Sequence, residues 1–267
     1  MIMNQAIQII AIPVLIGILL FLLPSALRWL KAIIALAVVL FAGYLAIRLF
    51  ATQDLVFSPD YWPSAEKFCS FSLDGLSKLI LLFISLLSLL VCIYTLNSKS
   101  SGAMRNFYAW FLITLGFSFG AVLANNLLLF LICWGILGIS LYMLAHPRDE
   151  LSSAAAKKTL ILIGASDGIM ILGIAIIWRV TGTLNMDEIA LPTSDLVRTI
   201  ACFCLLVGSF TKAGAFPFHT WIPDYSQTAP AASSAYLPAS LDKLLGIYFL
   251  ARITTQLLVM GDWRRGV

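Results

Sequence analysis

Two lysines, Lys212 and Lys243, lie in stretches that are otherwise almost wholly apolar. An ammonium group at the centre of a bilayer costs roughly 3 kcal/mol on insertion scales, and charged residues at that depth usually serve a function. His219 and Asp167 lie in or beside neighbouring apolar stretches. Both can exchange protons, and an imidazole does so near neutral pH. The two lysines predict a site for moving ions, in which His219 and Asp167 are further candidates for relaying protons.

Structural roles are the alternative for three of these four residues. The long stem of Lys212 would reach an interface and anchor its helix if the residue has no transport role. His219, in the sequence Phe218-His219-Thr220-Trp221, suits a packed and hydrogen-bonded loop as well as a relay. Asp167 suits a hydrogen bond between two helices equally well. The sequence therefore favours function for the lysines and leaves His219 and Asp167 open.

Four further residues are expected to have structural roles. Asp74 and Asp224 stand where helices are expected to start, and an aspartate there accepts hydrogen bonds from free backbone N–H groups. We expect them to cap helix starts or to brace loops. Trp134 and Tyr236 lie in apolar surroundings and are predicted to be packing residues.

The composition is that of an integral membrane protein. Of the 267 residues, 61% are hydrophobic and only 11% are charged, and the mean hydropathy is +0.97. About 20 apolar residues are needed to cross roughly 30 Å of hydrocarbon. Such runs, eight in all, predict an all-α, polytopic helical bundle of one domain. They cover approximately residues 5–24, 29–50, 76–96, 106–124, 126–145, 159–180, 198–216 and 232–257.

Several classes of function are not supported by the sequence. The five cysteines, Cys69, Cys92, Cys133, Cys202 and Cys204, lack the spacing of metal ligands. The net charge of +4 is spread along the loops without a basic cluster, so nucleic-acid binding is not expected. Because no nucleophile–base pair or phosphate-binding loop is visible, we expect no catalysis by the chain itself and no cofactor or metal.

The segments between the runs predict how the chain lies in the membrane. The first run follows an N-terminus without basic residues, so we expect a retained helix and not a cleaved signal peptide. Basic residues are more frequent in the connections after the first, third and fifth runs, which predicts an external N-terminus. The longest connection, residues 51–75, is expected to form an interfacial flap with a short hairpin.

The stretch from Gly208 to Gly246 is the most unusual part of the sequence. Its apolar character is interrupted by glycine and four prolines, beginning with Gly214 and Pro217 just after Lys212. Proline removes a backbone donor and clashes with the preceding turn of a helix. Broken helices at membrane depth are tolerated only when they are buried in protein or line a wet cavity. We therefore predict a broken helix around residues 212–217, as in transporters.

The sequence Gly208-Ser-Phe-Thr-Lys-Ala-Gly-Ala-Phe-Pro-Phe-His-Thr-Trp-Ile-Pro-Asp224 closely resembles a family signature. The family is that of the antiporter-like membrane subunits of respiratory complex I, Mrp-type cation/proton antiporters and membrane-bound energy-converting hydrogenases. Shorter similarities occur at residues 73–77, 126–134 and 164–168. Together they cover most of the chain from about residue 70 onward.

The resemblance implies a fold and a mechanism. A full subunit of the family has fourteen helices, including two five-helix inverted repeats that each contain a broken helix. Buried lysines pass protons along a hydrated axis at mid-membrane. Lys212 corresponds to the lysine of the first broken helix, and Lys243 lies where a second relay lysine is expected. Residues 105–257 would then form the first half repeat, and the first 100 or so residues would be peripheral helices.

This sequence departs from the family pattern in two ways. Relatives carry a Trp-Glu pair on the fifth helix, whereas this sequence reads Trp134-Gly135, so the usual Glu–Lys pair is not expected within the chain. Asp167 would replace the missing acid only if the sixth helix faces the axis. Asp242 is a poor partner for Lys243, because adjacent helical residues point about 100° apart. In addition, the second inverted repeat is not present in the sequence.

The resemblance implies a shortened antiporter-like subunit that relays H⁺ or Na⁺ through Lys212 and Lys243. Its expected partners are other membrane subunits, one of them supplying the missing half, and the lipid bilayer of a prokaryotic cytoplasmic membrane. The complex would be a redox-driven pump of the NADH, ferredoxin or hydrogenase type, or a cation/proton antiporter. The alternatives are a non-conducting scaffold and a fragment of a longer subunit, which the tail at residues 260–267 would fit.

Overall fold

The computed structural model describes residues 2–58, 69–97, 106–145, 149–192 and 195–259, and most of these residues are helical. The first part of the chain forms long helices. They are α1 (Ile2–Leu22), α2 (Arg28–Phe50), α3 (Gly75–Asn97), α4 (Phe107–Leu123), α5 (Leu127–Ala145) and α6 (Glu150–Thr181), with a 3₁₀ turn, η1 (Ser25–Leu27), between α1 and α2.

The last third of the chain is built from shorter helical pieces. They are α7 (Leu196–Ala213), η3 (Phe218–Thr220), α8 (Trp221–Thr228), α9 (Ala231–Tyr236), η4 (Leu237–Leu241), α10 (Asp242–Arg252) and η5 (Ile253–Leu257). Of these, η3 is a 3₁₀ turn, and η4 and η5 are π-helical turns. The eight predicted runs are all helical, and the predicted all-α membrane bundle with a broken helix is confirmed.

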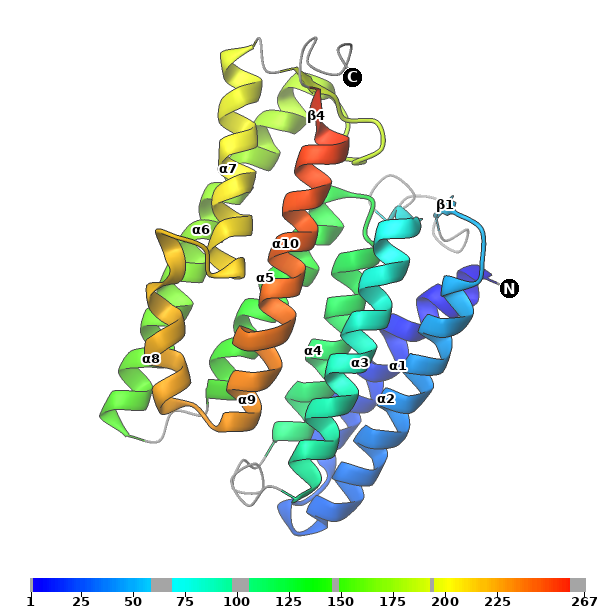
Figure 1. Ribbon diagram of the computed structural model, residues 1–267, viewed down its shortest axis with the longest axis vertical. Coiled ribbons are helices and arrows are strands. Elements are labelled where there is room, and N and C mark those ends of the chain that lie inside the picture. Colours follow the sequence, from blue (N-terminus) through cyan, green and yellow to red (C-terminus); the bar gives the residue numbers. More distant parts are fainter. Residues whose placement is uncertain (1, 59–68, 98–105, 146–148, 193–194, 260–267) are drawn as a thin grey trace.

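Figure 1 shows α1 and α2 on one flank of the bundle and α6, α7 and α8 on the opposite flank. Helices α3, α4, α5 and α10 lie between them. The main helix pairs are α1 with α4, α2 with α3, α6 with α7, and α10 with α7. Segments distant in sequence are therefore neighbours in the interior, and α10 in particular returns to pack against α7.

The outer surface of the bundle is apolar, as expected of a protein surrounded by lipid. Large hydrophobic side chains such as Leu22, Ile47 and Phe203 are more than half exposed. Six of the described helical segments are long and apolar enough to cross a membrane, and α4 is a shorter apolar helix. Polar side chains such as Lys212, Asp242 and Asn125 are buried inside. The chain is an integral membrane protein.

Short strands and polar contacts connect the helix ends. The predicted hairpin is present: β1 (Leu55–Phe57) pairs antiparallel with β2 (Phe71–Leu73), while residues 59–68 of the same connection lie outside the described residues. A second pair, parallel, joins β3 (Leu191–Pro192) to β4 (Leu258–Val259). The amide of Asn125 donates to Ser70 Oγ at 3.0 Å and to Asp187 Oδ1 at 2.7 Å, which ties two of these connections together.

The start of α6 shows how local sequence fixes a helix end. Asp149 is the N-cap, and its carboxylate accepts from the backbone N–H of Ser152 at 2.7 Å. The hydroxyl of Ser152 in turn accepts from the backbone N–H of Asp149, which completes a capping box. This capping box starts a helix that is longer than the predicted run at residues 159–180.

Candidate functional site

The helix break lies at about half the height of the bundle, where α7 ends and α8 begins beside it (Figure 1). Gly214 ends α7 in the left-handed conformation, with φ 68°, which glycine adopts without the strain that a Cβ would cause. Its N–H donates to the carbonyl groups of Phe210 and Thr211. The indole N–H of Trp221, from the first residue of α8, also donates to the Thr211 carbonyl, at 3.0 Å.

These contacts make the break stable at membrane depth. The last carbonyl groups of a helix have no partner within the helix, and at membrane depth each unsatisfied group costs several kcal/mol. Here the backbone and Trp221 provide partners for carbonyl groups at the end of α7. Pro217 follows the break and directly precedes η3. The predicted break at Gly214 and Pro217 is therefore present.

Lys212 lies in the last turn of α7 with only 1% of its side chain exposed. Its ammonium group donates to the backbone carbonyl of Trp134 at 2.9 Å and lies 4.4 Å from the centre of the Trp134 indole ring. The C-terminal end of a helix carries a partial negative charge, which favours a cation there. Lys212 is thus held in the interior, and it does not reach towards an interface.

Asp167 approaches the same point from α6. Its Oδ1 accepts a hydrogen bond of 2.9 Å from the indole N–H of Trp134, and its charge interacts with Lys212. Its other oxygen lies 3.9 Å from the position that a Cβ on Gly138 of α5 would occupy. The sixth helix therefore turns Asp167 towards α5 and Lys212, which is the condition set above for Asp167 to replace the missing acid.

Asp242, the first residue of α10, is the second carboxylate of the site and is fully buried. Its Oδ1 lies 4.0 Å from the Lys212 ammonium nitrogen. No donor among the described residues is hydrogen-bonded to either of its oxygens. The charge of Asp242 also interacts with Asp167 and with Tyr225 of α8. We call Lys212, Asp167 and Asp242, with Trp134 between them, the buried charge cluster.

The structure does not bring the other two predicted relay residues into this cluster. Lys243 is exposed on the outer face of α10, so the expectation that both lysines are buried is wrong for Lys243. The helical phase of α10 turns Asp242 inward, and the rotation of about 100° to the next residue here carries Lys243 onto the outward face. His219 is exposed on η3, where its ring lies 5.9 Å from that of Phe216.

Comparisons with known proteins identify the family of this chain. A sequence profile described as "NADH:quinone oxidoreductase/Mrp antiporter, TM" matches residues 124–266, which is more than half of the chain. The chain belongs to this family. The match includes every residue of the buried charge cluster.

Individual relatives extend the similarity towards the N-terminus. One Na(+)/H(+) antiporter subunit, from Alkalihalophilus pseudofirmus, is 32% identical over 198 residues, which are 71% of this chain and 24% of the relative. Another, from Staphylococcus haemolyticus, is 28% identical over 241 residues, 86% of this chain and 30% of the relative. The chain therefore spans between about a quarter and a third of the length of these two relatives.

Solved structures show the same fold. The Mrp complex of a Dietzia species contains a chain that matches with a TM-score of 0.85 at 21% identity, over 96% of this chain and 49% of that one. A chain of respiratory complex I from Thermus thermophilus matches with a TM-score of 0.76 at 24% identity, over 92% of this chain and 52% of that one. At this level of identity the likeness establishes the fold alone.

In this member of the Mrp and complex I family, Asp242 is a site residue that the sequence analysis did not predict. In the sequence it stands out only as the neighbour of Lys243. The available signal was its place in an apolar run, because a carboxylate within a membrane span is a candidate functional residue whichever helix supplies its partner. Its actual partner, Lys212, is on another helix. The sequence analysis named only Asp167 as a possible replacement for the missing glutamate, and the structure adds Asp242.

Three of the residues expected to have structural roles do have them, and Trp134 has a wider one. Asp74 caps α3, accepting from the N–H of Ser77 at 2.9 Å. Asp224 does not cap α8 but lies in its first turn, where it pairs with Lys158 of α6 at 2.5 Å. Tyr236 packs against Phe111 with ring centres 4.2 Å apart. Trp134 is fully buried and also contacts both Lys212 and Asp167.

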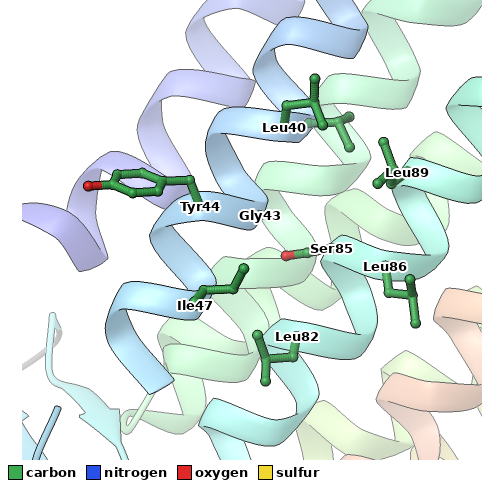
Figure 2. A pocket seen from close by; sticks show the side chains of 9 residues that line it. Leu40, Gly43, Tyr44, Ile47, Leu82, Ser85, Leu86 and Leu89 are labelled. Carbon is green, nitrogen blue, oxygen red and sulfur yellow. The ribbon is translucent and has the colours of Figure 1, made fainter. Parts of the chain in front are cut away.

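A groove on the outer surface of this antiporter-family chain lies between α2 and α3 and has a volume of about 490 Å³. Figure 2 shows leucine side chains, Ile47 and Tyr44 around it, with Ser85 at its floor. The hydroxyl of Ser85 donates to the carbonyl of Leu81 within its own helix. Because no charged side chain lines this groove, it offers no group that would carry an ion, and the buried charge cluster is the better candidate.

Proposed function

We propose that this chain is a proton-translocating part of an antiporter-like membrane complex, with Lys212 as its central proton carrier. The observation that carries this proposal is the position of Lys212 at the helix break, 1% exposed, with its ammonium 4.0 Å from a fully buried carboxylate. A buried charge of this kind is expensive and usually marks a pathway for ions. Family membership supports the same reading.

The chemistry of the cluster favours a proton over a metal cation. A charged lysine has three donors and no acceptor, so it can release and take up a proton but offers nothing to Na⁺. The described residues also contain no group of three or more His, Cys, Asp or Glu side chains that could hold a metal ion. Its pKa shifts readily when it is buried, in contrast to arginine. The end of α7 and the carbonyl of Trp134 stabilise the charged form of Lys212, whereas burial favours its neutral amine.

The exposed position of Lys243 supports an assembly with other membrane segments. Lys243 lies near the middle of the helical run from residue 231 to residue 257 and faces outward. A lysine that faces hydrocarbon at that depth costs roughly 3 kcal/mol or more. We infer that another subunit or segment covers this face of α10 and that Lys243 passes the proton to it. Since the compared antiporter subunits are bacterial, the host membrane would be a prokaryotic cytoplasmic membrane.

The test uses the complex assembled from the full chain and its partner subunits, reconstituted in vesicles. Lys212→Ala should abolish proton transport while the complex still assembles. Lys212→Arg keeps the charge but does not release it as a proton, so it should also stop transport. Lys157→Ala, at an exposed position of α6, is the matched control and should transport normally. Normal transport by both Lys212 variants would reject the proposal.

A further inference from the structure

We propose that Asp242 is the group with which Lys212 exchanges its proton, through one water molecule between the two side chains. This inference rests on the function proposed above and names the acid that replaces the glutamate absent at Gly135. It assigns to α10 a role that in the family pattern belongs to the fifth helix. Three properties of the molecule support it: the distance between the two groups, their charges, and the helix geometry that places Asp242.

The distance indicates a bridged contact. The Lys212 ammonium nitrogen and Asp242 Oδ1 are 4.0 Å apart, which is beyond a direct hydrogen bond of 2.7–3.2 Å. Asp242 is fully buried, and neither oxygen accepts a hydrogen bond from the described residues. A buried carboxylate without donors is costly, and a water molecule with two or more polar partners removes that cost. The ammonium of Lys212 and the carboxylate of Asp242 provide those partners.

The charges of the cluster add a second constraint. Lys212 contributes one positive charge, while Asp167 and Asp242 contribute two negative charges if all three groups are ionised. The other titratable group that interacts with Asp242 from a packed element is the hydroxyl of Tyr225, which donates to the carbonyl of Leu141 at 3.0 Å and is neutral. A net charge of −1 in a low-dielectric interior is unfavourable, so one extra proton is held by the carboxylates.

With that extra proton on Asp167, the exchange step is balanced and leaves the cluster neutral throughout. An N–H bond of the Lys212 ammonium breaks as the water takes its proton. The same water gives one of its own protons to the carboxylate of Asp242, and an O–H bond forms there. The pair changes from ammonium and carboxylate to amine and carboxylic acid. Because no net charge appears or disappears, neither state requires a compensating ion.

The π-helical turn η4 sets the face on which Asp242 lies. A π turn contains one more residue than an α turn and is frequently found at functional sites. In η4, the hydroxyl of Ser240 donates to the carbonyl of Ala235 at 2.6 Å, five residues earlier. Because one residue corresponds to about 100° of rotation, the extra residue of η4 rotates the side chains of α10 about the helix axis, relative to the positions they would have if α9 continued as a regular α-helix.

The interior contacts of α10 follow from this phase. The backbone of Gly246, one turn after Asp242, lies against Ala213 of α7, and its carbonyl accepts from Ser209 Oγ at 2.7 Å. Phe249 stacks on Phe130 of α5, with ring centres 4.2 Å apart. Asp242 is on the same face as these two residues, whereas Lys243 and Ile247 are exposed. The contact with α7 therefore aims Asp242, and not Lys243, at Lys212.

The experiment measures proton transport by the reconstituted complex with Asp242→Asn, Asp242→Glu and the double variant Asp242→Asn/Gly135→Glu. A Cβ at position 135 meets nothing within 4 Å, so the double variant adds a carboxylate next to Trp134 at a position with free space around its Cβ. Asp242→Asn should lower transport by roughly 100-fold, the order of a lost proton-transfer group. Asp242→Glu should retain part of it, and the double variant should recover part of it. Asp224→Asn, in a surface ion pair, is the control.

The outcomes separate this inference from the proposed function. If Asp242→Asn transports normally while Lys212→Ala does not, the inference is wrong and the function stands. If Lys212→Ala and Lys212→Arg also transport normally, the proposed function itself is wrong. If Asp242→Asn does not assemble, infrared difference spectra decide between the outcomes. A carboxylic-acid band that forms during transport and moves in Asp242→Glu supports the inference, and a band that is absent or unmoved overturns it.

Discussion

Arg252 of α10 and Asp74, the residue before α3, form a two-pronged ion pair although they are 178 positions apart. Nη2 of Arg252 donates to Oδ1 of Asp74 at 2.8 Å, and Nη1 donates to Oδ2 at 2.5 Å. Nε of Arg252 also donates to the hydroxyl of Tyr248, which donates to the carbonyl of Val122 in α4. This network joins α3, α4 and α10 at one end of the bundle, beyond the buried charge cluster.

Replacing Asp74 by asparagine should destabilise the protein by about 3 kcal/mol, because it leaves a buried arginine without its counter-charge. The Arg252 side chain is only 4% exposed. The change should appear as a lower melting temperature in detergent. Asp195→Asn is the control, since Asp195 pairs with Arg198 at 3.4 Å with both side chains partly exposed. Such a pair contributes at most about 1 kcal/mol, so equal losses in the two variants would contradict the prediction.

The same ion pair predicts how the effect depends on pH. Burial acts to raise the pKa of Asp74, but the hydrogen bond and charge of Arg252 and the hydrogen bonds with Ser77 outweigh it, so the pKa lies below its ordinary value of 3.8. A lowered pKa in the folded state stabilises fully above the unfolded pKa, and the contribution is lost as the pH falls through the folded value. The melting-temperature difference between wild type and Asp74→Asn should be constant near neutral pH and shrink below about pH 4.

Alanine at Gly246 should reduce both stability and proton transport. Its Cβ would lie 2.5 Å from the backbone nitrogen and 2.8 Å from the Cα of Ala213, so α10 must move away from α7. Overpacking of this kind costs about 1–3 kcal/mol. The movement would also separate Asp242 from Lys212, which adjoins Ala213. Thermal unfolding and vesicle transport measure the two effects.

The control for Gly246→Ala is Gly168→Ala on the exposed face of α6, where a Cβ meets nothing within 4 Å. Alanine there should be neutral or stabilising by up to about 1 kcal/mol, because alanine favours helix more than glycine does. Equal melting temperatures for the two variants would show that α7 and α10 do not need the close approach at Gly246.

Phenylalanine at position 134 should lower stability by about 2 kcal/mol and slow transport. The change removes the indole N–H that donates to Asp167 at 2.9 Å, and a buried acceptor left without its donor costs about 1–3 kcal/mol. The backbone carbonyl that accepts from Lys212 remains, so the complex should still assemble. Trp178→Phe, at a position 62% exposed, should change neither property. A Trp134→Phe variant that behaves like Trp178→Phe would refute the role of the indole.

Much of the fold could be predicted from local sequence. The apolar runs located the helical segments, and Gly214 and Pro217 located the break, because glycine and proline act on the backbone at their own positions. Asp74 was placed at a helix start because an aspartate there accepts hydrogen bonds from free backbone N–H groups. The external N-terminus, the boundaries of the half repeat at residues 105–257 and the relay role of His219 stay predictions.

The amino-acid sequence by itself determined that the chain crosses a membrane, that one helix is broken and that Lys212 stands at the break, since these follow from hydrophobicity and backbone chemistry within short segments. Only the tertiary structure decided that Asp242 faces inward and Lys243 outward. That choice depends on the π turn at residues 237–241 and on the packing of α10 against α7. A rotation of α10 by one residue would bring Lys243 into the position of Asp242, and contacts between helices distant in sequence fix that rotation.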